Sequence, residues 1–424
     1  MVVKVKLNTH SMIWLQIYLL ICVRLISNIV SNNVIVYLCD IVTIAILVFS
    51  LLKSKVRVSR MAVFFIAEAA FWLCSFLFGV SGSISAFIYL FRILVRFYIV
   101  FLACCGEMND DDYIKLFKVF DFIIFVHFAL VMFQIFVLHE TNGDFVGGIF
   151  GIVFGYGNSA SHALILFSTL ITFYKYFTEM ETIKFSLVKI AMSFTIAMLT
   201  EMKSFVFEAL IILLMFMLFN RKFKIRTMII IVMIPIAGIL FAKYIGSNFN
   251  FDIFSMNSIN SYLDNGYGFN IDGIGRTDGY QKVFDACFNG DITKTIFGFG
   301  FATSASDFTA EYFGNMNLGN FTYAKIFYDM GIVGTILYFI PFILCIIQGI
   351  RIRKQALNLS IFSILLGIFG IYYSFYGSLM ESDFSGYFYY ILMSIPFVMC
   401  NRLKNNKPVQ DFSIQKTTVK TIKE

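Results

Sequence analysis

The feature that most constrains the fold of this chain is a series of long apolar runs. A helix that spans a bilayer needs roughly 20 predominantly apolar residues. Twelve runs of about this length cover residues 11–31, 33–52, 61–80, 86–105, 118–138, 160–178, 186–200, 204–219, 227–245, 327–349, 357–377 and 387–400. The chain is only 14% charged, whereas soluble domains are about 25% charged. We therefore predict an all-α polytopic membrane protein with about 12 transmembrane helices, which excludes a soluble globular protein.

Lysine and arginine gather in alternate connectors between these runs. Residues 53–60, 220–226, 351–354 and the tail from Asn401 are basic, whereas residues 377–386 are acidic. Placing the N-terminus in the cytoplasm puts 24 of the 33 lysines and arginines on the cytoplasmic side, as the positive-inside rule requires. We therefore expect both termini to be cytoplasmic. The net charge of +7 is then explained without a nucleic-acid partner.

One connector is much longer than the others. Its roughly 80 residues exceed the length at which a loop usually carries function or structure of its own, and its aromatic content indicates that it folds. The predicted organisation of the chain is transmembrane helices 1–9 in residues 1–245, a large periplasmic loop in 246–326, transmembrane helices 10–12 in 327–400 and a basic cytoplasmic tail in 401–424.

Two arginines lie within one predicted span, although a charge at the centre of a bilayer costs at least about 2.5 kcal/mol. Arg92 and Arg96 are four residues apart, so they share one helix face, in the outer half of the membrane. Their forked donors match the oxygens of a diphosphate. The alternative is that they pair with Glu68 or Asp40 and fix helix packing, and the two interpretations are compatible.

Three further charged or polar groups lie within spans. We interpret Arg24 as an interfacial residue whose charged head reaches water. His127 is interpreted as a packed, hydrogen-bonded histidine rather than a proton relay. Glu208 is expected to pair with Lys203, one and a half turns away.

Short motifs follow one another in and around the large loop. They are residues 275–280 (GRTDGY), 298–301 (GFGF), 320–326 (NFTYAKI) and 329–334 (DMGIVG). In this order they resemble the O-antigen and capsular polysaccharide polymerases and the related O-antigen ligases. Those proteins carry a Gly-Arg element followed by an aromatic residue, a Gly-x-Gly turn, and an Asn-aromatic element that leads into an acidic-x-Gly-Ile-x-Gly helix start.

The resemblance covers roughly residues 147–340, and it implies a GT-C-like architecture. Upstream of the loop, residues 148–158 look like the glycine-phenylalanine-asparagine segment of the family, and residues 199–204 (LTEMKS) look like its Thr-x-Ser-Arg element. Lys203 stands at the arginine position of that element, which loses the bidentate fork. Glu381 falls where relatives often have an acidic residue.

The resemblance implies a glycosyltransferase, specifically a polymerase of lipid-linked repeat units. Such enzymes move a growing glycan from one undecaprenyl diphosphate to the sugar of another lipid-linked unit, at the periplasmic face of the bacterial inner membrane. The expected partners are the polyprenyl-diphosphate-linked donor and acceptor, membrane lipid and a chain-length regulator protein. We expect no cofactor and no metal ion, because the diphosphate leaving group is already activated.

The chemistry of this reaction selects two sets of candidate residues. A cationic clamp must neutralise the charge that grows on the departing diphosphate, and a carboxylate takes the proton of the acceptor hydroxyl. Candidates for the clamp are Arg276, Arg92, Arg96 and Lys203, with Arg276 first. Candidates for the base are Glu311, Asp307, Asp278 and Glu381.

Two other functions remain as alternatives. An O-antigen ligase, which transfers glycan to lipid A core, shares the architecture, but ligases often carry a histidine beside the loop asparagine, and here Gly319 precedes Asn320. A lipid-linked oligosaccharide flippase or other transporter also has many spans, but it does not need so long an outer loop.

Overall fold

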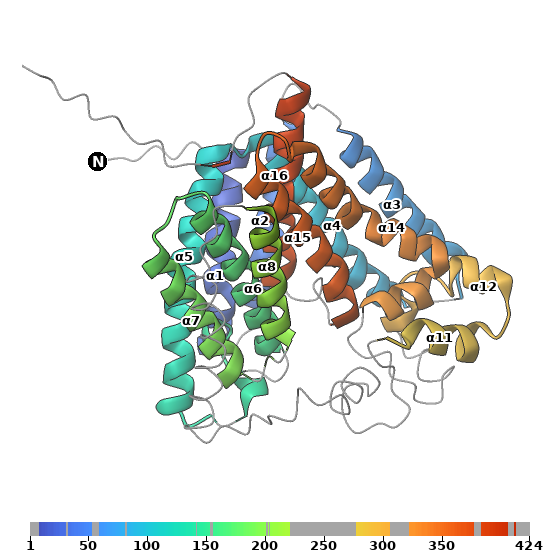
Figure 1. Ribbon diagram of the computed structural model, residues 1–424. Helices are drawn as coiled ribbons and strands as arrows, with labels where there is room; N and C mark the ends of the chain where they lie inside the picture. The colour runs from blue at the N-terminus through green and yellow to red at the C-terminus, as the bar shows by residue number, and fades with distance from the viewer. Residues whose placement is uncertain are drawn as a thin grey trace, which may run out of the picture.

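The computed structural model describes residues 8–30, 33–52, 59–80, 83–140, 142–152, 156–200, 202, 204–220, 277–305, 322–376, 383–405 and 411–412. These residues are almost entirely helical (Figure 1). The long helices are α1 (Thr9–Val30), α2 (Leu38–Leu51), α3 (Arg60–Phe78), α4 (Ile84–Glu107), α5 (Asp110–Phe136), α6 (Tyr156–Phe177), α7 (Ile183–Leu199), α8 (Ser204–Phe219), α14 (Thr322–Ile352), α15 (Leu357–Tyr376) and α16 (Asp383–Lys404). Two short helices, α11 (Gly279–Val283) and α12 (Ile292–Phe297), belong to the large loop.

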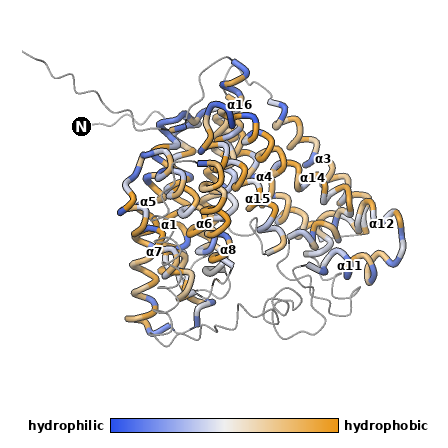
Figure 2. Tube along the Cα trace, viewed as in Figure 1, coloured by the Kyte–Doolittle hydropathy of each residue, from blue (hydrophilic) through white to orange (hydrophobic). Residues whose placement is uncertain are grey.

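Seven helices in the described part of the chain are long and apolar enough to cross a membrane, namely α1 to α5, α14 and α15. Apolar residues run along the helices of the bundle, and polar residues gather near its ends and in the loop (Figure 2). The predicted all-α membrane architecture is therefore confirmed. Helices α6, α7, α8 and α16 also form at predicted spans, whereas the run at 227–245 lies outside the described residues, so the number twelve stays a prediction.

The bundle has two ends, which we call the termini end and the loop end. At the termini end, His10 of α1 lies 3.0 Å from Asp112 of α5, and Arg402 of α16 lies 2.6 Å from Asp110 of α5. The first turn of α1 and the last turn of α16 are thus neighbours. At the opposite end, α11 and α12 pack on the first turns of α14 (Figure 1).

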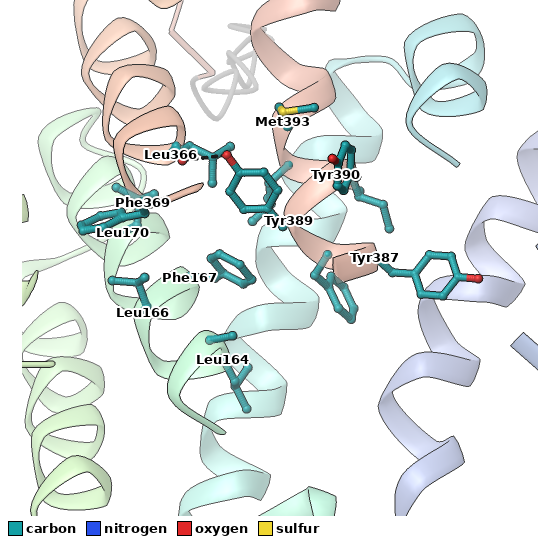
Figure 3. Packing of buried hydrophobic residues seen from close by; sticks show 14 of the residues in the cluster. Leu164, Leu166, Phe167, Leu170, Leu366, Phe369, Tyr387, Tyr389, Tyr390 and Met393 are labelled. Carbon is teal, nitrogen blue, oxygen red and sulfur yellow. Dashed lines mark hydrogen bonds between the residues drawn. The ribbon is translucent and has the colours of Figure 1, made fainter. Parts of the chain in front are cut away.

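Helix α16 occupies the centre of the bundle, and its residues from Asp383 to Cys400 are all buried. Figure 3 shows Tyr389 of α16 beside Phe167 of α6 and Phe369 of α15. The Tyr389 hydroxyl donates a hydrogen bond to the carbonyl oxygen of Leu366 at 2.9 Å, which satisfies a polar group that burial would otherwise penalise. This central position explains how a helix rich in tyrosine and serine fits inside the bundle.

Candidate functional site

Arg92 and Arg96 of α4 lie at the loop end and contact the same carboxylate. Arg92 Nη1 lies 3.5 Å from Asp40 Oδ2, and Arg96 Nη1 lies 3.1 Å from Asp40 Oδ1. Arg96 Nη2 also lies 2.5 Å from Asp383 Oδ1, and Arg24 Nη2 lies 2.8 Å from Asp383 Oδ2. These five residues, which we call the arginine network, join α1, α2, α4 and α16 through alternating charges.

The members of this network differ in how completely they are enclosed. The side chains of Arg96 and Asp383 are 5% and 6% exposed, whereas that of Arg92 is 33% exposed. The Arg92 guanidinium lies over the rings of Tyr37 and Tyr89, at 5.0 and 5.3 Å from their centroids. Because arginine has five donors and Asp40 is a distant partner, Arg92 is the member best able to bind an anion.

The sequence predicted part of this arrangement. The pairing of the two α4 arginines with Asp40 is confirmed, but pairing with Glu68 is wrong, because Glu68 packs against another side of α4, next to Tyr98. The interpretation of Arg24 as an interfacial residue with its head in water is also wrong, since Asp383 binds it inside the bundle.

Asp383 was not among the predicted site residues. It lies in the polar connector 377–386, just before the run that predicted the last span, so hydropathy assigned it to a loop. A signal for it did exist: three arginines within spans require more carboxylates than Asp40 alone.

Of the remaining predicted site residues, Asp278 is described. It immediately precedes α11, and its Oδ2 lies 2.7 Å from Lys282 Nζ, one turn later. Both side chains are partly exposed, at 29% and 37%, so this pair is a surface ion pair of small energetic weight. The other predicted residues lie outside the described part of the chain, and their roles stay predictions: Arg276, Lys203, Glu311, Asp307 and Glu381.

The Gly-x-Gly turn and the acidic helix start form one structural unit. The Asp329 carboxylate accepts hydrogen bonds from the backbone N–H of Ala302 at 3.1 Å, the backbone N–H of Ser304 at 2.7 Å and the Ser304 hydroxyl at 2.9 Å. The backbone N–H of Gly300 donates to the Asp329 carbonyl at 2.8 Å. The acidic residue of this motif therefore holds the loop on α14, and its carboxylate is occupied by that role.

Two glycines make this close approach sterically feasible. Gly331 interrupts α14 with a φ of 61°, and Gly298 has a φ of 73°, a region that side-chain-bearing residues rarely adopt. A Cβ at Gly331 would lie 2.5 Å from the carbonyl carbon of Ile296, and one at Gly298 would lie 2.4 Å from that of Asp329. The spacing of these motifs thus serves docking of the loop.

Residues 277–305 have an aromatic core of their own against α14. Tyr280 contacts Tyr323 and Phe327 edge to face, with centroids 4.8 and 5.0 Å apart, and the backbone N–H of Gly279 donates to the Tyr323 hydroxyl at 3.0 Å. Burial raises the pKa of Tyr280, and it raises the pKa of the Cys287 thiol to about 12. This part of the loop is folded, and its cysteine is an unreactive packing residue.

The loop also contacts the helices that border the arginine network. The backbone N–H of Phe301 donates to the Ser75 hydroxyl at 3.2 Å. The Phe301 ring stacks on Trp72 at 5.6 Å and meets Phe87 edge to face at 5.9 Å. Phe87 belongs to α4, five residues before Arg92, so the folded loop and the exposed arginine lie at the same end of that helix.

His127 has a defined tautomer. Its Nδ1 accepts a hydrogen bond from the backbone N–H of Ile149 at 3.3 Å, and its Nε2 lies 2.7 Å from the Ser161 hydroxyl. Because Nδ1 accepts, the proton must reside on Nε2 and the ring is neutral. The interpretation of His127 as a packed, hydrogen-bonded histidine is confirmed.

Glu208 pairs with a histidine of another helix, and the predicted pair with Lys203 stays a prediction. Its Oε2 lies 2.8 Å from His162 Nε2, and both side chains are 3% exposed. The sequence suggested Lys203, which lies outside the described residues. A pair between α6 and α8 was missed because His162 and Glu208 are 46 residues apart in the chain.

The chain matches no known protein-family model and no curated protein sequence. Across the described ranges, no group of three histidine, cysteine, aspartate or glutamate side chains is placed to hold a metal ion. Within the described ranges, the arginine network brings three guanidinium groups together with two carboxylates.

Proposed function

We propose that this protein is a glycosyltransferase that polymerises undecaprenyl-diphosphate-linked oligosaccharide repeat units into O-antigen or capsular polysaccharide. The observation that carries the proposal is Arg92, a partly exposed arginine held at the loop end beside a folded loop. The resemblance of the loop motifs to those of polysaccharide polymerases supports the same conclusion.

In this reaction, the hydroxyl oxygen of the acceptor sugar attacks the anomeric carbon of the donor glycan. The bond from that carbon to the diphosphate oxygen breaks, and negative charge develops on the departing lipid diphosphate. Arg92 is proposed to stabilise this charge, while Asp40 holds Arg92 in place and Arg96 stays bound to its two carboxylates. Arg276 and Lys203 complete the proposed clamp.

The acceptor hydroxyl must also lose a proton. A carboxylate near the reacting sugar is the proposed acceptor of this proton, with Glu311, Asp307, Asp278 and Glu381 as the candidates. Asp278 is the weakest of them, because its carboxylate is paired with Lys282. The reaction needs no oxidant or cofactor, since one glycosidic bond forms as one sugar–diphosphate bond breaks.

The proposed topology is a GT-C-like bundle of about 12 spans in the bacterial inner membrane, with both termini cytoplasmic. Helix α8 ends at the termini end, where Asn220 Nδ2 donates a hydrogen bond to Asn358 Oδ1 at 2.8 Å, and the next described helix, α11, lies at the loop end. The proposal therefore places one further crossing between them. The positive-inside rule makes the termini end cytoplasmic and the loop end periplasmic.

The test is the sugar ladder of a strain that lacks this gene, complemented with variants. A polymerase mutant should retain single repeat units on lipid A core, whereas a ligase mutant would have none, and that result would overturn the proposal. Cytoplasmic accumulation of the lipid-linked unit would instead indicate a flippase.

Complementation with Arg92→Gln should give at least roughly tenfold less polymer than complementation with wild type. Removing one donor to the charge of a transition state commonly lowers the rate by about 10²–10³-fold. The matched control is Arg402→Gln, since Arg402 is also partly exposed, at 26%, and paired with one aspartate, but lies at the termini end. Normal polymer from Arg92→Gln at normal protein level would exclude the clamp.

A further inference from the structure

Glu68 lies in the third turn of α3 and is the least explained charged group of the bundle. It is 1% exposed, and neither carboxylate oxygen makes a hydrogen bond of standard geometry to a described residue, although the Tyr98 hydroxyl lies beside it. The two arginines of the neighbouring helix α4 are bound to Asp40 instead. Glu68 therefore sits in the membrane-spanning part of the protein without an ion pair to any described residue.

Three more buried polar atoms lie in the same part of the bundle. They are Trp72 Nε1 on α3, the Tyr98 hydroxyl on α4 and the Tyr390 hydroxyl on α16, and none makes a hydrogen bond of standard geometry within the described ranges. The two hydroxyl groups lie near the Glu68 carboxyl group and near each other. The Tyr98 ring centroid is 5.7 Å from that of Trp72 and 5.6 Å from that of Tyr390, and Phe65 stacks on Tyr98 at 3.8 Å. Three aromatic side chains that carry polar groups, from three helices, thus pack together beside Glu68.

An ionised carboxylate is incompatible with such surroundings. Burying an unpaired charge is so costly that the group takes up a proton instead, and the cost is higher in the membrane interior. A protonated carboxyl group has both a donor and an acceptor, and each phenol can donate and accept as well. Protonation therefore gives all four polar groups partners of suitable type, directly or through water.

We propose that Glu68, Trp72, Tyr98 and Tyr390 form a proton-binding site, in which Glu68 takes one proton from water and remains a neutral carboxylic acid. The titratable groups around it are Tyr98 on α4, Tyr390 on α16 and, next to both tyrosines, Tyr338 on α14. No charged side chain of the described chain pairs with Glu68. The site is separate from the arginine network and does not depend on the proposed polymerase activity.

The site lies where helix α3 packs against the rest of the bundle, so the protonation state of Glu68 affects how α3 is held. The buried side chains of α3 are Phe65, Glu68 and Trp72, so this site is the main attachment of α3 to the bundle. One turn farther along, Ser75 binds the loop residue Phe301. A neutral Glu68 thus allows α3 to hold the folded loop in place.

Infrared spectroscopy of the purified full chain in lipid vesicles tests the proposal directly. The difference spectrum of wild type minus Glu68→Gln at neutral pH should contain the carbonyl band of a protonated carboxylic acid, with the deuterium shift of an exchangeable proton. Glu179→Gln is the matched control, because Glu179 is exposed and should remove carboxylate bands only. Loss of carboxylate bands in Glu68→Gln would overturn the proposal and indicate an ionised group held by a cation such as sodium.

Thermal stability gives a second, independent readout. Glu68→Gln is neutral and similar in shape, so its melting temperature should stay within about 2 °C of wild type, while Glu68→Ala should melt lower. Equal destabilisation by Gln and Ala would contradict a neutral Glu68. If Glu68→Gln fails to fold, the carboxylic acid band of wild-type protein carrying isotope-labelled glutamate decides, because its absence refutes the site.

Discussion

Two clusters of charged side chains lie at opposite ends of the bundle, and they differ in the ratio of positive to negative charges. At the termini end, Lys175 and Lys189 both bind Asp121 and Glu181, in a group that we call the lysine cluster. Lys189 Nζ lies 2.5 Å from Asp121 Oδ1 and 2.6 Å from Glu181 Oε2. Two positive charges meet two negative ones, and both lysine side chains are at most 9% exposed.

The arginine network at the loop end is built differently. It combines three arginines with two aspartates, and Arg92 is 33% exposed. A balanced, enclosed cluster is suited to fixing helix packing, whereas a network with a partly exposed arginine is suited to receiving an anion. The two clusters therefore differ in charge balance and in exposure, and the proposed function assigns anion binding to the more exposed one.

The largest effect is expected from Asp383→Ala, which removes the shared partner of Arg24 and Arg96. Breaking a buried ion pair costs roughly 3–5 kcal/mol, so the variant should unfold at a much lower temperature in detergent. Asp110→Ala is the control at the other end of the bundle, since Asp110 is 45% exposed and its pair is worth about 0–1 kcal/mol. Similar melting temperatures for the two variants would contradict the claim that the buried Asp383 ion pairs stabilise the fold more than the exposed Asp110 pair.

A second experiment exchanges a whole cluster. Replacing Asp121 and Glu181 by leucine and Lys175 and Lys189 by methionine should leave stability equal or improved, because apolar replacements of complete buried ion pairs are often neutral or stabilising by about 1–4 kcal/mol. Polymer should be unchanged on the sugar ladder.

In the arginine network, Arg92→Met alone leaves Asp40 paired with Arg96 and should reduce polymer at least as strongly as Arg92→Gln, while the protein remains in the membrane. Loss of polymer from the folded lysine-cluster variant would show that the lysine cluster is also needed for the reaction. It would contradict a purely structural role for that cluster.

A third, smaller effect concerns the docked loop. Gly331→Ala forces a side chain into a positive-φ conformation, which costs roughly 1–3 kcal/mol, and pushes Cβ against Ile296. Residues 277–305 should become more sensitive to protease while the bundle stays intact. Gly106→Ala is the control, because a Cβ added at Gly106 would meet no atom within 4 Å apart from its chain neighbours and the nearby backbone of its own helix. Unchanged protease resistance in Gly331→Ala would argue against this docking arrangement.

The smallest effect is expected where the tail meets the termini end. The Asp411 carboxylate accepts hydrogen bonds from the backbone N–H of Leu359 at 2.8 Å and of Asn358 at 3.3 Å, and burial raises its pKa. A raised folded-state pKa means that the docked tail holds a proton more tightly than the free tail. Docking should therefore be strongest below the ordinary aspartate pKa of about 3.9 and should weaken as the pH rises through the folded-state value.

Amide hydrogen exchange at Asn358 and Leu359 measures this dependence. Exchange, corrected for its intrinsic pH dependence, should be slowest at the acidic end of the range. Asp411→Asn should keep most of the protection and lose the pH dependence, while Asp411→Ala should lose both. Protection of these amides that increases with pH would contradict the prediction that docking of the tail weakens as the pH rises.

The sequence predicted the positions of the helices better than it predicted which charged side chains contact each other. Apolar runs located the long helices because spanning length and composition are local properties. The helical repeat also placed Arg92 and Arg96 on one face, and the cost of a buried charge pointed to Asp40. By contrast, Arg24 and Asp383 are separated by 359 residues, and no local pattern states which helices are neighbours.

The loop motifs were visible in the sequence, but their structural role was not. Asp329 and Ser304 are 25 residues apart, and an acidic residue in such a motif is equally compatible with catalysis and with hydrogen bonding to a loop. Only the fold shows that backbone N–H groups occupy its carboxylate. The proposed base and the first clamp residue, Arg276, therefore still depend on the resemblance.

The contact between the loop and α3 limits how this protein can be engineered. Val80 at the end of α3 donates its backbone N–H to the Phe299 carbonyl at 2.7 Å, while the Phe299 N–H donates to the Tyr328 carbonyl of α14 at 3.1 Å. The short segment around Phe299 thus connects two helices, α3 and α14, that are distant in the sequence. A chimaera that grafts this loop from another protein would have to import the partnering end of α3 with it, so the two segments form a single exchangeable module.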